Sequence, residues 1–433
     1  FILSVPDSAV LQVSFVGYES IEVSVGGRKT LEIQLRENTV MLDNVIITAL
    51  GLEKKEASLA YSIQKVKGEE LTRMKEVNMI TALAGKAAGV QINKNSSGIG
   101  GSAKVSLRGI RSASGDNQPL YVIDNIPQAS TGEFSSSGIS GDFQIAQDPL
   151  SSLNPADIED ITILKDASST AIYGSKGANG VVLITTKHGK AGKINISAKA
   201  ETFYNMLTQV PDFVDGYTYA SMANEAKITR NLEPLYKADE LEIFRLGLDP
   251  DLYPNVNWID ELLRKGSWST RATLSMNGGG NTARYYVSGS YLDQQGMYKV
   301  DKALKDYNTN ANFRRWNYRM NVDIDITKST LLKVGVSGSL QKANDSGVGS
   351  DAIWTALMGY NAIMVPKLYS NGYVPAYGND NGDRFNPWVQ ATMTGYRENW
   401  KNNIQTNVTL EQKLDFITKG LRFVGRFGYD TEN

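Results

Sequence analysis

Hydrophobic and polar residues alternate along seven strand-length segments between about residue 193 and residue 433. In the segment near residue 320, Met320 and Val322 fall on one face, and Arg319 and Asn321 fall on the other. One apolar face and one charged or polar face on every segment is typical of a transmembrane barrel with a wet lumen. We therefore expect consecutive antiparallel strands whose apolar side chains face lipid.

The connections between these segments alternate between short and long. Short turns are expected at 277–281, 328–330 and 416–420, whereas the other three connections are much longer. If the first segment rises from the periplasmic side, every long loop lies outside the cell, as in outer-membrane barrels. Barrels that hold a plug have about 22 strands, so we expect the barrel to be incomplete in this chain.

The composition excludes several classes of site. The chain has no cysteine and a single histidine, His188, which rules out disulfides, thiolate chemistry and histidine-rich metal sites. A formal net charge of −1 supplies no basic field for nucleic acid. We interpret His188, in the run Lys-His-Gly-Lys, as part of a solvated turn. No catalytic, cofactor-binding or metal-binding residue is predicted, and we do not expect an enzyme.

The stretch from Leu153 to Lys190 predicts a compact strand–helix–turn–strand unit. Residues 161–165 form a short apolar run of strand length, and Asp166 or Ser168 follows as a helix cap. Residues 181–186, Val-Val-Leu-Ile-Thr-Thr, read as a buried strand. Three glycines are interpreted as turn positions with positive φ: Gly174, Gly177 and Gly180.

The same stretch resembles the plug domain of TonB-dependent outer-membrane transporters, in the version of the SusC/RagA family. The resemblance rests on four motifs in order: Asn-Pro-Ala-Asp-Ile-Glu at 154–159, Leu-Lys-Asp-Ala at 164–167, Ala-Asn-Gly at 178–180 and Ile-Thr-Thr-Lys at 184–187. It implies a mixed α/β plug domain inside a transmembrane antiparallel β-barrel.

The resemblance also divides the chain into four regions. The first resembles the end of a carboxypeptidase-regulatory-like β-sandwich, the second is a linker, the third is the plug, and the fourth is the first part of the barrel with its long extracellular loops. Their predicted limits are 1–36, 37–55, 56–192 and 193–433.

The linker contains a short β-branched segment that is similar to the TonB box of the family. A TonB box pairs as an added strand with the sheet edge of a periplasmic partner, TonB. The candidate residues are Asn44, Val45, Ile46, Ile47 and Thr48, with Asn44 in place of the usual acid. The alternative interpretation is a last strand of the preceding sandwich.

Aromatic residues gather in the third long connection. Flat aromatic faces stack on sugar rings and equally well on apolar peptide side chains. We therefore predict that this loop contacts substrate through Trp354, Tyr360, Tyr369, Tyr373, Tyr377 and Trp388. The Ser/Gly-rich stretch 128–152 is a second candidate for substrate contact, or else a solvated insert.

The resemblance implies TonB-dependent active import of a large nutrient across the bacterial outer membrane, where the chain would contact lipid. The expected cargo is an oligosaccharide, and the expected partners are TonB and a SusD-like surface lipoprotein, with a homodimer of transporter–lipoprotein pairs as a further expectation. Two alternatives stay open: a peptide importer of the RagA type, and an outer-membrane receptor or signalling protein with little transport. No nucleic-acid partner is expected.

Overall fold

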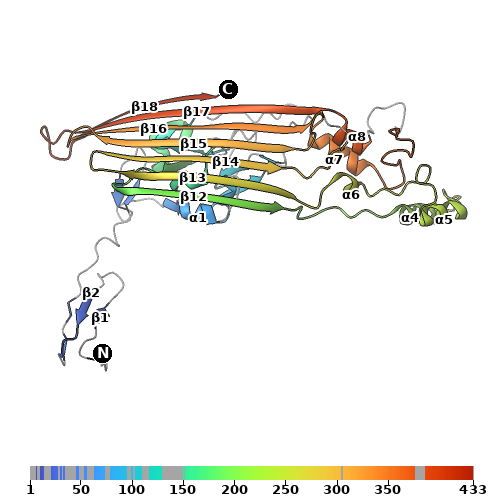
Figure 1. Cartoon of the computed structure of the whole chain (residues 1–433), viewed down its shortest axis with the longest axis horizontal. Helices are drawn as coiled ribbons and strands as arrows, with labels where there is room; N and C mark the ends of the chain where they lie inside the picture. The colour runs from blue at the N-terminus through green and yellow to red at the C-terminus, as the bar shows by residue number, and fades with distance from the viewer. Residues whose placement is uncertain are drawn as a thin grey trace.

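The chain forms a seven-stranded sheet, a smaller α/β domain packed on it, and short hairpins near the N-terminus (Figure 1). The computed structural model describes residues 6, 10–13, 21–27, 30–31, 33–34, 45–47, 53–55, 63–73, 79–94, 99–100, 103–109, 117–128, 150, 152–303, 306–375 and 386–432.

The large sheet, here called the wall, consists of consecutive antiparallel strands in chain order. Their bounds are β12 Gly192–Asn205, β13 Ser267–Gly279, β14 Ala283–Gln295, β15 Asn312–Asp325, β16 Thr330–Ser346, β17 Tyr396–Lys413 and β18 Arg422–Glu432. Pairing is continuous from β13 to β18, as between Arg319 and Ser337 or Ser337 and Gln405, and the β12–β13 register shifts once, between Gly192 and Asn195. This confirms the prediction of successive antiparallel barrel strands. Among the described residues the sheet is open, with β12 and β18 at its edges.

The two faces of the wall have opposite polarity. On β15, Tyr318 and Met320 are exposed on the outer face, whereas Arg319, Asn321 and Asp323 are buried on the inner face. A soluble sheet would bury the apolar side chains instead. The arrangement matches a wall whose outside meets hydrocarbon and whose inside is covered by polar material.

Long connections leave the wall at one end and short turns at the other (Figure 1). The connection between β12 and β13 contains α4 (Gly216–Ile228), α5 (Ala238–Leu246) and α6 (Trp258–Leu262). The connection between β16 and β17 contains α7 (Ser350–Gly359) and α8 (Pro387–Thr392). In the part of the chain that the structure describes, no helix is both long enough and apolar enough to span a membrane.

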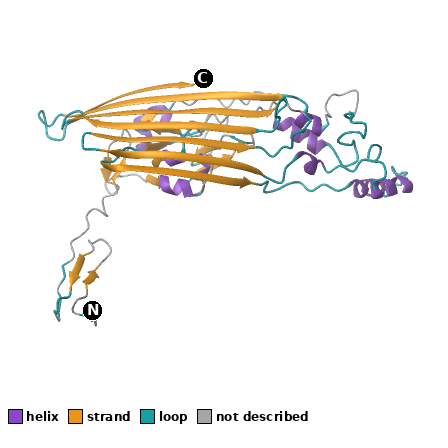
Figure 2. Ribbon diagram, viewed as in Figure 1, coloured by secondary structure: helices purple, strands orange, loops and turns teal. Residues whose placement is uncertain are grey.

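The smaller domain, here called the plug, lies against the inner face of the wall (Figure 2). Its five-stranded sheet has the order β5-β10-β11-β8-β9, in which β8 and β11 are parallel. The sheet strands are β5 Ile63–Lys67, β8 Leu120–Ile123, β9 Ile126–Pro127, β10 Ile158–Leu164 and β11 Val181–Thr186. A separate hairpin joins β6 (Val90–Lys94) and β7 (Ala103–Leu107). The helical elements are α1 Gly68–Arg73, α2 Met79–Ala82, η4 Pro155–Asp157, α3 Ala167–Thr170 and η5 Ala171–Gly177.

One buried cluster forms the core of the plug. It joins helix residues such as Leu71 and Ile80 to strand residues such as Leu107, Ile161 and Val182. Burial of each large aliphatic side chain contributes about 1.5–3 kcal/mol. The plug therefore has a core of its own, and it meets the wall through polar contacts and through a small apolar contact of Ile99 with Leu292 and Phe313.

Glycines in the 153–190 stretch serve two different purposes. Gly174 and Gly180 have positive φ values of 60° and 97°, as the sequence predicts. Gly177 does not, so that prediction is wrong: a Cβ there would lie 2.8 Å from the Thr170 carbonyl oxygen, and glycine is needed for space. Gly180 is crowded as well, because a Cβ would lie 2.5 Å from Leu107 Cδ1.

Near the N-terminus the described pieces are two antiparallel hairpins. One pairs β1 (Val10–Val13) with β2 (Ile21–Ser24), and the other pairs β3 (Val45–Ile47) with β4 (Glu53–Lys55). The β-sandwich over 1–36 and the limits of the four regions stay predictions.

We expect charge on the outer face of the wall to be penalised far more than charge on the inner face. Leu274 of β13 is 57% exposed on the outer face, and its neighbour Thr273 points inward. In the full-length protein, Leu274→Arg should cost about 2–4 kcal/mol near the bilayer centre, and Thr273→Arg should cost less. The measurement is the free energy of unfolding in lipid vesicles. Equal costs at the two positions would contradict the membrane orientation of the wall.

Candidate functional site at the plug–wall interface

A buried cation from the wall lies between two carboxylates of the plug. Arg319 of β15 has a side chain that is 3% exposed. Its Nη1 lies 3.5 Å from Asp124 Oδ2, and its Nε lies 4.0 Å from Asp157 Oδ2. Because ions buried without partners are strongly penalised, these three groups depend on one another.

Each carboxylate is also held by neutral donors. Tyr286 of β14 donates its hydroxyl to Asp157 Oδ1 at 2.9 Å. Asp124 accepts from the backbone N–H of Thr186 at 2.9 Å and from its hydroxyl at 2.7 Å. Burial raises the pKa of Asp157, and the opposing charge of Arg319 limits that rise. The cluster therefore joins two wall strands to three separate parts of the plug.

The last residues of the plug continue this line of contacts along β15. We call residues 186–189 the exit segment, because they lead from β11 into β12. Asn321 donates to Thr186 Oγ1 at 2.9 Å and to the Lys187 carbonyl at 2.7 Å. His188 Nδ1 lies 3.0 Å from Asp323 Oδ1. The interpretation of His188 as part of a solvated turn is therefore wrong: the ring is half-buried against the wall.

The surroundings of His188 act on its pKa in both directions. Burial lowers it, but the hydrogen bond with Asp323 and the charges of Asp124 and Asp323 raise it more, against a smaller opposing effect of Lys333. The net result is a pKa above the usual value of 6.5. Protonated His188 therefore strengthens the attachment of the exit segment.

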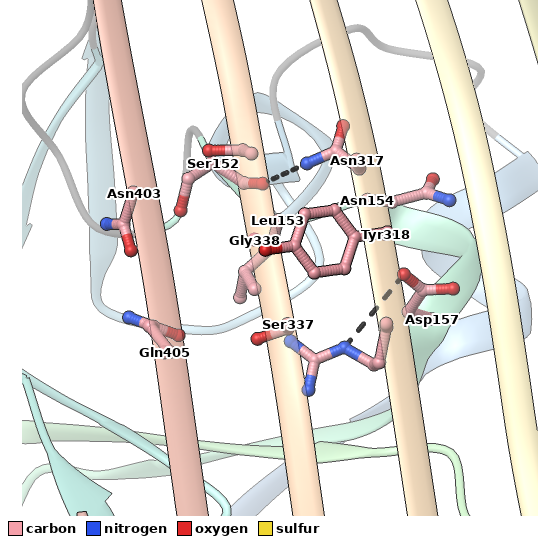
Figure 3. A pocket seen from close by; sticks show the side chains of 12 residues that line it. Ser152, Leu153, Asn154, Asp157, Asn317, Tyr318, Ser337, Gly338, Asn403 and Gln405 are labelled. Atoms are coloured by element: carbon pink, nitrogen blue, oxygen red, sulfur yellow. Dashed lines mark hydrogen bonds and ion pairs between the residues drawn. The ribbon is translucent and has the colours of Figure 1, made fainter. Parts of the chain in front are cut away.

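A small polar cavity lies beside the Arg319 cluster, between the plug and strands β15–β17 (Figure 3). Its volume is about 10 Å³, room for about one water molecule. On its plug side are Ser152 and Asn154, and on its wall side are Ser339 of β16 and Asn403 of β17. The side-chain amide of Asn317 donates to the Ser152 carbonyl. Among the described residues, Ser339 Oγ and Asn154 Nδ2 are buried without a hydrogen-bond partner.

Two of the predicted substrate-contact aromatics are core residues of the external loops. Trp388 is 5% exposed and Tyr360 is 3% exposed, and both belong to one buried cluster with Trp258 and Leu357. The rings of Trp258 and Tyr360 meet edge to face at 5.7 Å. Trp354 is half-buried and packs against this cluster. These residues hold the first and third long connections together.

The other loop candidates are placed differently. Tyr373 is 73% exposed. Tyr369 is half-buried, and its backbone N–H donates to the Tyr373 carbonyl at 2.9 Å. Tyr377, and all of the stretch 128–152 except 128, 150 and 152, lie outside the described residues. Contact of any of these residues with substrate stays a prediction.

The TonB-box candidate is extended where the structure describes it. Val45–Ile47 forms β3, paired with Glu53–Lys55, whereas Asn44 and Thr48 lie outside the described residues. In the described part of the chain, β3 has no other strand partner. Its pairing with TonB stays a prediction.

The residues of the Arg319 cluster were not identified as a site from the sequence. The alternation places Arg319 only on the polar face of a strand, and the resemblance places Asp157 only within a plug motif. One feature of the sequence indicates the site: Arg319 is a charged residue in the middle of a strand, on its inward face. A cation in a covered lumen needs a counter-charge, so an acidic partner is expected. For metal binding, no cluster of three or more His, Cys, Asp or Glu side chains occurs among the described residues.

The comparisons with known proteins agree with this architecture. The family model for the TonB-dependent Receptor Plug Domain matches residues 55–181. The chain is 33% identical over 324 residues to the TonB-dependent receptor SusC of Bacteroides thetaiotaomicron, covering 74% of this chain and 28% of that protein. The chain belongs to the SusC/RagA-type TonB-dependent receptors. Members of this family are β-barrel proteins of the outer membrane, which is therefore the location of this one.

Two further comparisons extend over nearly the whole chain. The TonB-dependent receptor P3 of Formosa agariphila is 30% identical over 443 residues, covering 100% of this chain and 38% of that protein. The fold is also similar to the RagAB peptide importer in its open-open state, with a TM-score of 0.68 and 21% identity, covering 90% of this chain and 42% of that chain. This SusC/RagA-type chain thus spans less than half the length of the relatives it matches.

Removing the buried cation should loosen the plug. Arg319→Ala leaves Asp124 and Asp157 buried without their counter-charge, which we expect to cost about 3–5 kcal/mol in free energy of unfolding. The matched control is Arg314→Ala on the same strand, whose partly exposed pair with Asp293 should contribute less than about 1 kcal/mol. Denaturant unfolding of the full-length protein in detergent measures both. Similar losses of stability in the two variants would show that the buried Arg319 contributes no more than a partly exposed ion pair.

The His188 contact should make plug attachment depend on pH. Because the folded pKa is raised, its contribution is fully present below about pH 6.5, the unfolded pKa, and is lost as the pH rises through the folded pKa. His188→Gln should remove this dependence. The measurement is the difference in free energy of unfolding between wild type and variant across the range from about pH 5 to about pH 9. A difference that grows with rising pH would contradict the raised pKa of His188 in the folded protein.

Proposed function

We propose that the chain is the plug and first wall of a transporter that imports a large nutrient across the outer membrane with energy from TonB. The observation that carries this proposal is the plug itself, seated on the polar inner face of the wall through Arg319. A wide barrel needs such a closure to remain impermeable at rest. A closure held by polar contacts can be displaced and restored, because those contacts exchange with water.

The extended segment at Val45–Ile47 supports coupling to TonB. It lies upstream of β5, the edge strand of the plug sheet. A β-branched strand with an open edge is suited to strand addition by a periplasmic partner. Force applied there reaches the plug through β5, which pairs with β10, the strand that follows Asp157.

Neutral polar groups on the inner face favour an oligosaccharide as the cargo. Ser337, Ser339 and Gln341 of β16 and Asn403 and Gln405 of β17 carry hydroxyls and amides. Such groups both donate and accept, as sugar hydroxyls require. The exposed ring of Tyr373 could stack on a sugar. Peptide import is the second candidate, because the fold is similar to that of the RagAB peptide importer.

The external loops provide a platform for the proposed SusD-like lipoprotein. The buried cluster around Trp258 and Trp388 ties helices from two long connections together. Lys367 lies 3.6 Å above the Trp388 ring and pairs with Glu261 at 2.8 Å, which joins the two connections again. A partner would therefore meet a preorganised surface. Pairing of two transporter–lipoprotein units remains part of the proposal.

Uptake of two labelled probes by cells carrying the full-length protein tests the proposed cargo. We expect neutral oligosaccharides to accumulate and a tryptic digest of albumin not to accumulate. Accumulation of the digest alone would establish the peptide alternative. Surface binding without accumulation of either probe would favour a receptor with little transport.

Breaking the TonB-box candidate should uncouple binding from uptake. Ile46→Pro removes a backbone donor and restricts φ, so strand addition should fail. We expect uptake to be lost while protein level and surface binding persist. Ile46→Thr keeps the donor and the β-branched shape, and it should retain uptake. Normal uptake by the proline variant would place the coupling segment elsewhere.

A further inference from the structure

Charged residues gather on the outer face of the wall, near the end that carries the long connections (Figure 1). Arg314 of β15 is exposed on this face, whereas its neighbours Phe313 and Arg315 are buried on the inner face. Because side chains alternate along a strand, the same outer face carries the charged residues beside Arg314 on the adjoining strands. We call the following four residues the rim quartet: Asp293 of β14, Arg314 of β15, Lys342 of β16 and Glu398 of β17.

The rim quartet begins where the apolar band of the outer face ends. From Trp316 to Ile326, every outward residue of β15 and its continuation is aromatic or aliphatic, and Arg314 is the next outward residue above them. At about 3.4 Å per residue this band is about 34 Å long, and a strand tilt of about 40° reduces its height to about 26 Å. Outer-membrane barrels present an apolar band about 25 Å tall. Arg314 therefore lies at the level of the lipid headgroups.

Aromatic rings mark the same boundary. Tyr291 and Trp316 lie opposite each other one outward position below the rim quartet, and their ring centroids are 5.4 Å apart. Trp400 is 51% exposed, and its Nε1 donates to Glu398 Oε1 at 2.7 Å. Tyrosine and tryptophan form such belts where a membrane protein meets the headgroups. The surroundings of the rim quartet are therefore those of a membrane interface.

The two cations of the rim quartet are opposite each other in the sheet. Arg314 pairs in register with Lys342, whose Nζ also lies 4.5 Å from the centroid of the Trp400 ring. Residues directly opposite have Cβ atoms about 4.5–5.5 Å apart, and like charges at that separation repel. The acids stand on the two outer strands. Asp293 Oδ1 lies 3.2 Å from Arg314 Nε. Glu398 Oε2 lies 2.8 Å from Lys342 Nζ. The centre of the rim quartet is therefore positive.

Arg314 is well suited to bind an anion at this centre. Its side chain is 45% exposed, and it meets Asp293 through Nε. The planar fork of a guanidinium matches the oxygens of a phosphate and binds them in bidentate fashion. Ion pairs that are this exposed are weak, so the flanking acids compete only weakly with a phosphate.

We propose that the rim quartet binds the phosphorylated headgroup of an outer-leaflet lipid, with one phosphate bridging Arg314 and Lys342. The anion relieves the repulsion between the two cations, and the apolar band directly below accommodates the acyl chains. Basic clusters at the membrane boundary are suited to lipid headgroups in this way. The site lies on the face of the sheet opposite the plug, so it does not depend on what the transporter imports.

Retention of lipid by the purified full-length protein tests the proposal. The probes are diphosphoryl lipid A and its fully dephosphorylated form, and native mass spectrometry measures the bound fraction of each. We expect wild type to retain the diphosphoryl form, and Arg314→Gln combined with Lys342→Gln to retain it about tenfold less or weaker still. Equal retention of the two lipids by wild type would indicate contact without phosphate recognition and would overturn the proposal.

The matched control removes the same charge from the external loops. Arg230 and Arg245 are exposed in the connection between β12 and β13. Arg230→Gln combined with Arg245→Gln should retain diphosphoryl lipid A as wild type does. If this control and the variant at 314 and 342 retained the lipid equally, the rim quartet would not be the site.

Removal of the flanking acids should have the opposite effect. Asp293→Asn combined with Glu398→Gln leaves both cations in place and takes away the carboxylates that compete for them. We expect this variant to retain more diphosphoryl lipid A than wild type, a gain that loss of folding cannot produce. Unchanged or lower retention would contradict the proposed role of the two cations.

Inorganic phosphate separates a lipid site from a site for a free anion. Because a lipid also contacts the apolar band, an excess of inorganic phosphate should leave bound lipid A in place. Displacement of lipid A by inorganic phosphate at a comparable concentration would show that the acyl chains contribute nothing. That result would overturn the assignment to a lipid.

Discussion

The structure depends on the burial of one cation, Arg319, between the plug carboxylates of Asp124 and Asp157. Without the plug, Arg319 would lack its counter-charges, and without the wall, both carboxylates would lack theirs. Removing one member of such a group is costly because the remaining charge is left in a poorly solvating environment. The contact therefore makes the seated plug a preferred state, not one of many loose positions in the lumen.

The inverted polarity of the wall explains why this contact is needed. Its outer face carries exposed apolar residues such as Leu274 and Met320, and its inner face carries polar groups. A plug with an apolar surface could not cover that inner face without burying unpaired donors and acceptors. The plug instead keeps most of its apolar residues in its own core and presents Asp157, Thr186 and the exit segment to the wall, with Ile99 as an apolar contact.

The external loops follow the opposite rule, because they build a small apolar core away from the lumen. Trp388 and Tyr360 are buried there with Trp258, so their aromatic faces stabilise loop structure. Tyr373 is exposed and is better placed to meet a ligand. The aromatic content of a loop therefore does not by itself locate a binding surface, since packing and recognition use the same side chains.

The sequence alone determined the strands of the wall, because strict alternation leaves few folds other than a barrel. It also determined the plug turns at Gly174 and Gly180, because the positive φ of a turn residue is a local property of the backbone. Pairing across the plug–wall interface could not be predicted, because it depends on which inward residues the register places opposite Asp124 and Asp157. The burial of His188 and of Trp388 could not be predicted for the same reason: burial is a property of neighbours that are distant in sequence. Alternation tells which face a side chain occupies, whereas only the tertiary structure decides what covers that face.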